Sequence, residues 1–169
     1  MRTGREKRCR ILAALFVSAA LVLGGVGCPR SAPEDLSKEA ELLVLDGKFD
    51  EAIPVLKQRL LENPYDAGAH YYLARCFQFA AKPWLAVAEG ELETALRLFN
   101  EQGKKSPIAR FQPDYFEMIC HIDIGKIRLR QIMVLLDSGV AGRADLQPLL
   151  DSGRQAAAKA KQIIPDANE

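Results

Sequence analysis

Apolar side chains recur every three or four positions through most of residues 36–164, which is the spacing of helices that each bury one face. No stretch alternates apolar and polar residues for long enough to predict a strand that could build a sheet. Glycines and prolines interrupt the helical spacing at 46–48, 63–64 and 102–113. The pattern therefore predicts an all-α chain.

The second half of this region is expected to hold two long helices. Residues 102–113 contain glycine and two prolines and predict a loop, and residues 114–164 then predict a C-terminal helical pair that completes the same domain. Residues 114–137 are interpreted as one long helix with Gly125 as a possible break, and Asp145 as the N-cap of the last helix. The apolar stripe of that last helix is Leu146, Leu149, Leu150, Gly153, Ala157, Ala160 and Ile164.

The start of the chain has a different pattern, a basic segment followed by an apolar run over residues 11–23. This order is typical of an export signal, and the run is shorter than the roughly 20 residues that a membrane-spanning helix needs. Residues 1–27 hold five of the 23 basic and one of the 22 acidic residues, so the remainder has 18 basic and 21 acidic residues, a net charge of −3. A mildly acidic domain with interspersed charges does not indicate nucleic-acid binding.

The apolar run leads through three glycines to Cys28. The sequence from Leu23 to Cys28 resembles the lipobox of bacterial lipoproteins, although Gly25 stands where that family usually has leucine. The resemblance implies that residues 1–27 are a signal peptide, that Cys28 is lipidated, and that residues 28–35 are a lipidated N-terminus and short tether. It also implies an exported protein, anchored to the cell membrane or outer membrane, with its domain on the periplasmic or extracytoplasmic side. A secreted protein and an N-terminal anchor helix are the alternatives.

Residues 36–101 contain two units in which small and turn-forming residues have a regular spacing. They resemble two tetratricopeptide repeats (TPR), and the second unit has about two extra residues around 82–84. The resemblance implies a TPR-like α-solenoid of helix pairs with a C-terminal long-helix hairpin. The repeat-defining residues are Gly47, Ala52, Pro64, Ala74 and Ala88.

The first helices of such repeats line an inner surface that receives protein segments. In the second unit the inward positions hold tyrosine, arginine and phenylalanine, which are residue types frequent at binding hot spots. The resemblance thus implies partner-binding residues at Tyr71, Arg75, Gln78 and Phe79. The alternative is that these side chains pack against the third helical pair.

Titratable residues do not form a recognisable catalytic or metal-binding pattern. Glu89 and Glu93 lie four residues apart and are interpreted, with Arg97, as one solvated and salt-bridged helix face. His70 occupies a core position of the repeat, and His121 has no further ligands at a metal-binding spacing. We therefore expect no catalytic residues, no metal site and no cofactor.

Two other pairs of residues are assigned structural roles. Cys76 and Cys120 are interpreted as buried thiols, with a disulfide between them as the alternative. Lys126 and Arg130 form a basic pair on the long helix, which helix solubility explains more simply than contact with anionic headgroups.

Together these features predict a non-catalytic, membrane-tethered adaptor or assembly factor of the cell envelope. Its partner would be an envelope protein or a peptide segment. One alternative is a structural spacer that self-associates into a homo-oligomer. The other is a helical protein that binds a small ligand or lipid between its last two helices.

Overall fold

The computed structural model describes residues 33–139 and 143–163, with side chains at 37–139 and 146–163. These residues form helices and no strand, which confirms the predicted all-α class. The helices belong to one compact unit. The predicted signal peptide and Cys28 lie outside the described residues. The helices are α2 (Pro33–Leu45), α3 (Phe49–Glu62), α4 (Ala67–Phe79), α5 (Leu85–Glu101), α6 (Pro113–Asp137) and α7 (Arg143–Ile163).

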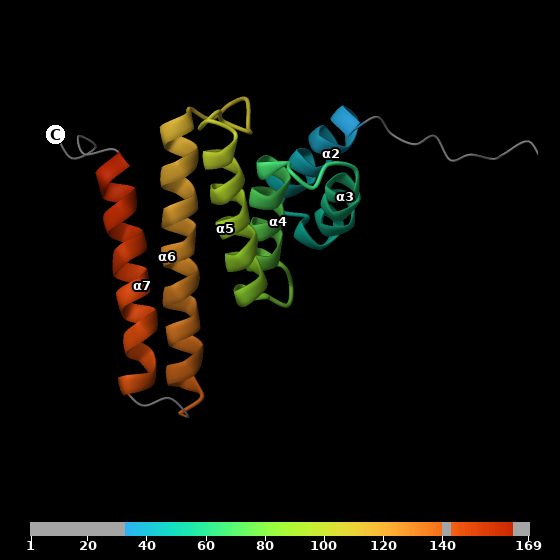
Figure 1. The fold of residues 1–169 in the computed structure, drawn as a ribbon. Helices are drawn as coiled ribbons and strands as arrows, with labels where there is room; N and C mark the ends of the chain where they lie inside the picture. The colour runs from blue at the N-terminus through green and yellow to red at the C-terminus, as the bar shows by residue number, and fades with distance from the viewer. Residues whose placement is uncertain (1–32, 140–142, 164–169) are drawn as a thin grey trace, which may run out of the picture. The chain divides into compact units, whose positions relative to one another are not determined.

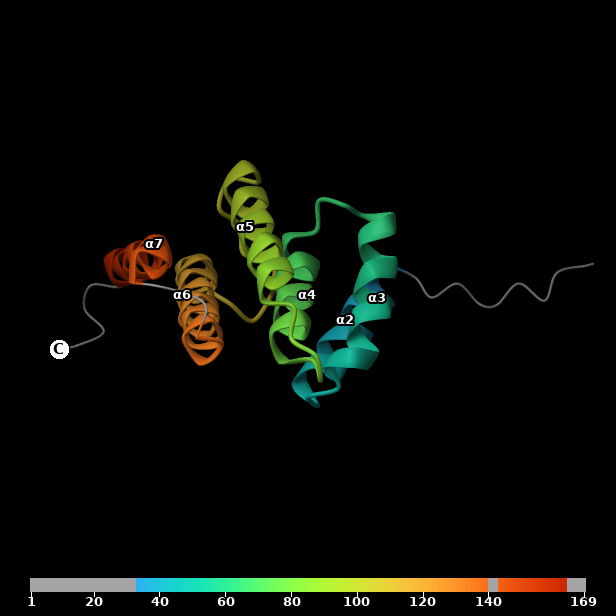
Figure 2. The ribbon, with the colours of Figure 1, turned by 90° about the horizontal axis from the view of Figure 1, so that it is seen from below.

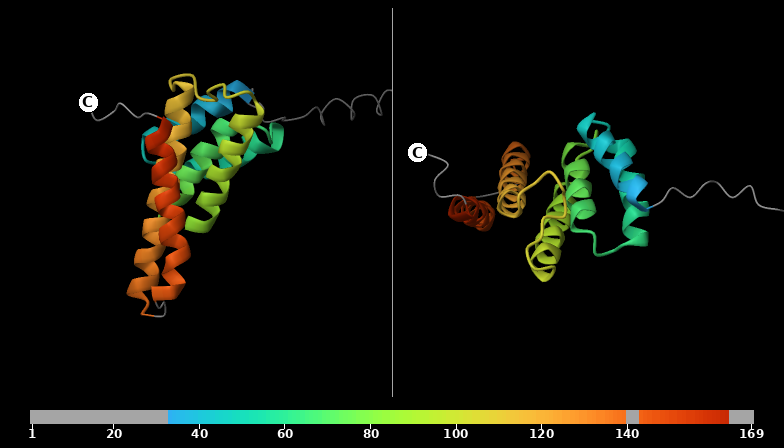
Figure 3. Two further views of the ribbon diagram at one scale, coloured as in Figure 1. Left: turned by 60° about the vertical axis from the view of Figure 1, so that its left-hand side comes forward. Right: turned by 90° about the horizontal axis from the view of Figure 1, so that it is seen from above.

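The helices pack against one another in chain order (Figure 1). Each helix contacts the next along the sequence, and α2 also contacts α4. Figure 2 shows α2 and α3 at one end of this row and the α6–α7 hairpin at the other. The view from above in Figure 3 gives the same order. Neighbours in sequence are therefore neighbours in space.

The turn between α2 and α3 follows from one glycine. Gly47 has φ +74°, a left-handed conformation that glycine adopts without a steric penalty. The amide of Gly47 donates to the carbonyl of Val44 at 3.2 Å, and the amide of Lys48 donates to that of Leu43 at 2.9 Å. These two bonds form a Schellman motif, which satisfies carbonyls at the end of α2. The reversal brings α3 back against α2, where Ala52 is fully buried.

An aromatic cluster joins the repeat-like pairs to the C-terminal pair. Tyr71, Phe99 and Phe116, from α4, α5 and α6, are each fully buried. The ring centroid of Phe116 lies 5.6 Å from that of Tyr71 and 5.2 Å from that of Phe99. Burying side chains of this size stabilises the fold by roughly 1.5–3 kcal/mol each. The core is thus continuous from α2 into α6.

Three helix positions differ from those predicted. Helix α2 begins at Pro33, so the end of the predicted tether is helical; proline fits a first turn because the N–H it lacks has no partner there. Helix α7 begins at Arg143, so Asp145 lies in the first turn and is not the N-cap. Helix α6 continues without a break through Gly125, which faces the carbonyl of Gly153 on α7.

Candidate functional site

The four predicted partner-binding residues all lie on α4 but differ in exposure. Tyr71 is fully buried against α6, and burial raises the pKa of its hydroxyl to about 12. Gln78 is also buried, and its backbone carbonyl accepts a hydrogen bond of 2.9 Å from Arg130 of α6. The packing of Tyr71 on Phe116 of α6 is the arrangement that the alternative interpretation expected. Phe79 is exposed, and Arg75 is partly so.

Phe79 is the centre of a cationic aromatic cluster. Its side chain is 42% exposed at the end of α4, and its ring lies 5.5 Å from that of Phe49. Two guanidinium groups lie over the Phe79 ring, with Cζ of Arg75 5.8 Å and Cζ of Arg130 5.7 Å from the centroid. The sequence separated these residues into a predicted site and a solubility pair. The structure brings them together, and we call Arg75, Phe79 and Arg130 the Arg–Phe cluster.

Neighbouring groups stabilise the positive charge of Arg75. Burial opposes its positive charge, but the hydroxyl of Tyr71 and the charge of Asp123 outweigh that effect and raise the pKa of Arg75. Asp123 is itself buried and accepts a hydrogen bond of 3.0 Å from Lys126. The face shared by α4 and α6 therefore presents fixed cations around one exposed ring.

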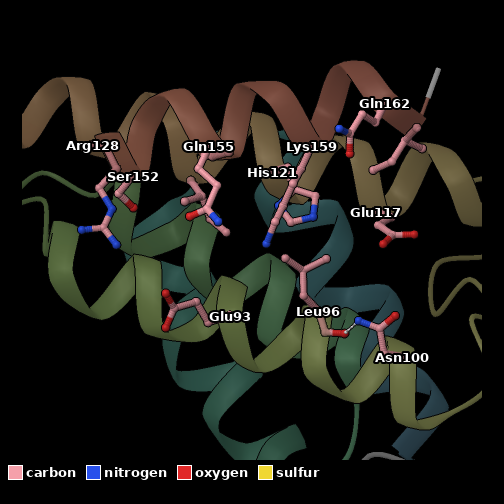
Figure 4. Close-up of a pocket in the computed structure, with 13 residues that line it drawn as sticks. Glu93, Leu96, Asn100, Glu117, His121, Arg128, Ser152, Gln155, Lys159 and Gln162 are labelled. Carbon is pink, nitrogen blue, oxygen red and sulfur yellow. Dashed lines mark hydrogen bonds between the residues drawn. The ribbon is translucent and has the colours of Figure 1, made fainter. Parts of the chain in front are cut away.

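A polar groove of about 490 Å³ lies between α5, α6 and α7. Figure 4 shows Glu93 on α5, His121 on α6 and Lys159 on α7 around it. Burial and the nearby charge of Lys159 lower the pKa of His121, which favours the neutral imidazole. Within the described residues no hydrogen bond joins His121 to a nucleophile or a carboxylate. The groove therefore combines polar groups of both charges.

A second groove, of about 520 Å³, lies between α6 and α7 and is largely apolar. Gly125 and Gly153 lie at its floor, and Leu129 contributes an exposed apolar side chain to its wall. We call this feature the apolar groove. It lies between the last two helices, which is where the alternative hypothesis expected a small ligand or lipid to bind.

The predicted exposed face of α5 is partly wrong. Glu89 is only 7% exposed and forms an ion pair with Arg128 of α6, and Gln131 donates to its other oxygen at 3.3 Å. Glu93 is exposed as expected. Arg97 pairs with Glu101, one turn further on, at 2.9 Å. Glu89 is buried because α6 packs over that part of α5.

His70 and the two cysteines make contacts that hold the fold together. Nδ1 of His70 lies 2.6 Å from a carboxylate oxygen of Glu91, and Nε2 lies 3.1 Å from the carbonyl of Pro64. Burial acts to lower the pKa of His70, but these hydrogen bonds and the charge of Glu91 raise it overall. Cys76 and Cys120 are buried free thiols, and burial raises the pKa of Cys76 to about 12. Neither thiol is poised as a nucleophile.

No group of three or more His, Cys, Asp or Glu side chains in the described segments is placed to hold a metal ion. None of the helices α2 to α7 combines the length and the apolar composition required to cross a membrane. Comparison of the chain with protein-family models, with curated proteins and with solved structures found no match.

Proposed function

We propose that this chain is a non-catalytic TPR-like adaptor that is tethered to a membrane through Cys28 and binds an envelope protein or peptide segment. The packing supports the repeat part of the proposal. Each helix packs on its neighbours in sequence, as in solenoid arrays, and α2 contacts α4 as successive first helices do. The predicted close-contact residues Ala52, Ala74 and Ala88 are all buried.

The observation that carries the binding proposal is the exposed Phe79 ring beneath two arginines from different helix pairs. Aromatic and arginine side chains contribute most at protein interfaces when the partner excludes water from them. Each cation–π contact is worth about 0.5–1 kcal/mol at an exposed site and more once water is removed. The cluster fits a partner segment that places an apolar side chain on Phe79 and a carboxylate between Arg75 and Arg130.

Affinity capture tests this site. The tagged full-length chain is captured from crosslinked, detergent-solubilised membranes, beside Phe79→Ser/Arg130→Gln and the control Trp84→Ser/Arg97→Gln, which changes an exposed aromatic residue and an exposed arginine elsewhere. We expect one partner to be lost only in the first variant, while both variants keep the helical circular dichroism spectrum of the parent. Partners retained equally by all three proteins would refute the Arg–Phe cluster as the site.

The tether has a separate test. If Cys28 is acylated, cells fed an alkynyl fatty acid will label the chain, and Cys28→Ser will abolish the label and release the protein from sedimented membranes. Persistent labelling of Cys28→Ser would contradict the lipid anchor without bearing on the Arg–Phe cluster.

One observation favours self-association as a second function. The distal half of α6 exposes Met133, Val134 and Leu136, each more than half accessible. Apolar residues gathered in this way often mark an interface. Sedimentation velocity over a range of concentrations tests it, with Met133→Gln/Leu136→Gln as the variant. A chain that stays monomeric at every concentration excludes the spacer.

A further inference from the structure

The apolar groove is produced by small residues where α6 and α7 pack together. Gly125 and Gly153 face each other there, and Ala157 follows one turn later on α7. Ala157 was predicted on the buried stripe, yet it is exposed, and Ala156 is buried in its place. The missing side chain volume at these positions leaves the seam open along one side.

The groove runs along both helices. Its lining covers residues 121–132 of α6 and 149–160 of α7, which corresponds to about 16 Å along each helix at 1.5 Å per residue. Ile122, Leu129, Leu150 and Ala157 contribute apolar surface, and the volume of about 520 Å³ is typical of a small-molecule site. This length accommodates one extended alkyl chain.

The charged residues that line the groove are all basic. They are Lys126, Arg128 and Arg154, of which Arg128 is held in the ion pair with Glu89 of α5. Lys126 pairs with Asp123 at 3.0 Å and Arg154 pairs with an acidic residue one turn away at 3.4 Å, and both basic side chains are more than half exposed. Exposed pairs of this kind contribute little stability, so either cation is able to turn toward another anion.

We propose that the apolar groove binds a fatty acid, with the acyl chain in the seam and the carboxylate at Lys126 and Arg154. An uncharged or cationic amphiphile lacks the ion pair, and a two-chain phospholipid has one chain more than the seam accepts. This site goes beyond the proposed adaptor function and is separate from the Arg–Phe cluster.

Photocrosslinking of the full chain in phosphatidylcholine nanodiscs tests the site, with dodecanoic acid that carries a diazirine as the probe. Labels mapped by peptide mass spectrometry are expected in residues 121–132 and 149–160. Excess dodecanoate should compete with the probe, dodecanol should compete about tenfold less well, and dodecyltrimethylammonium should not compete. Labelling spread over other helices, or equal competition by the cationic amphiphile, overturns the proposal.

Two neighbouring alanines provide a matched pair of variants. Ala157 and Ala158 are both exposed on α7, but only Ala157 lines the groove. Ala157→Leu should reduce labelling by about tenfold because it fills the seam, whereas Ala158→Leu should leave labelling and the melting temperature unchanged. Equal labelling of the two variants overturns the assignment of the groove.

A separate variant tests whether Lys126 and Arg154 recognise the carboxylate. Lys126→Gln/Arg154→Gln should weaken competition by dodecanoate about tenfold and leave that by dodecanol unchanged, while Lys161→Gln, outside the groove, should change neither. If the double variant weakens both competitors alike, the cations do not recognise the carboxylate and the fatty-acid assignment fails.

Discussion

The ion pair between Glu89 and Arg128 connects α5 to the C-terminal hairpin, and its loss should weaken the fold measurably. The Glu89 side chain is 9% exposed and that of Arg128 is 21% exposed. Replacing Glu89 with alanine leaves the guanidinium largely enclosed without its counter-charge. It also removes the acceptor of the hydrogen bond from Gln131.

The magnitude follows from this burial. Removing one member of a buried pair typically costs about 3–5 kcal/mol, and because Arg128 keeps some contact with water we expect the lower limit, about 3 kcal/mol. Replacing both members by apolar residues, as in Glu89→Leu/Arg128→Met, should recover most of that loss. Glu93→Ala is the matched control, since Glu93 lies one turn further along α5 and is exposed. Its effect should stay within about 0.5 kcal/mol.

Urea unfolding of the four proteins, followed by circular dichroism at one pH, gives the free energies of unfolding. The comparison of Glu89→Ala with Glu93→Ala decides between two placements. If both substitutions have the same small effect, the two glutamates share one exposed face as the sequence pattern suggested, and the packing of α6 over α5 is wrong.

Four further predictions concern packing and pH. Ala52→Trp should lower the melting temperature strongly, because overpacking a fully buried contact costs about 1–3 kcal/mol. Gly68→Ala should destabilise, since its Cβ would lie 3.2 Å from a backbone carbonyl oxygen, whereas Gly90→Ala, in open space on α5, should raise the melting temperature by the helix propensity of alanine. The raised pKa of His70 stabilises the fold at pH below its ordinary value of 6.5, and this contribution disappears as pH rises through the higher folded pKa; His70→Gln should therefore lower the melting temperature more at pH 5.5 than at pH 9. The lowered pKa of His121 acts in the opposite direction, because protonation of this side chain at low pH destabilises the fold. His121→Gln should therefore change the melting temperature more favourably at pH 5.5 than at pH 9.

The features that the sequence predicted well depend on local spacing. The helical period requires no knowledge of distant residues, and the all-α class followed from it directly. The alanines Ala52 and Ala88, which are buried, were named from the resemblance to the repeat, in which a small residue stands at a fixed spacing where two helices approach. The turn at Gly47 also follows from a single residue, because a left-handed φ favours glycine.

The features that the sequence missed depend on which element covers which. Glu89 and Glu93 look alike on the helical wheel of α5, and only the position of α6 separates a buried ion pair from an exposed carboxylate. Tyr71 was placed on a binding surface for the same reason, since its aromatic partner Phe116 lies far along the chain on α6. On α7 the predicted stripe was right at Leu146 and Ala160, which are buried, but wrong at Ala157, because α6 covers Ala156 instead.

Three consecutive residues of α6 show how one helix serves several surfaces. Arg128 pairs with Glu89 of α5, Leu129 lines the groove beside α7, and Arg130 donates to α4 and lies over Phe79. With 3.6 residues per turn, successive side chains project about 100° apart, so three neighbours in sequence face three different directions. Such a helix has no single apolar face. It also makes the surfaces separable: Leu129→Gln should weaken fatty-acid labelling alone, and Arg130→Gln should weaken partner capture alone.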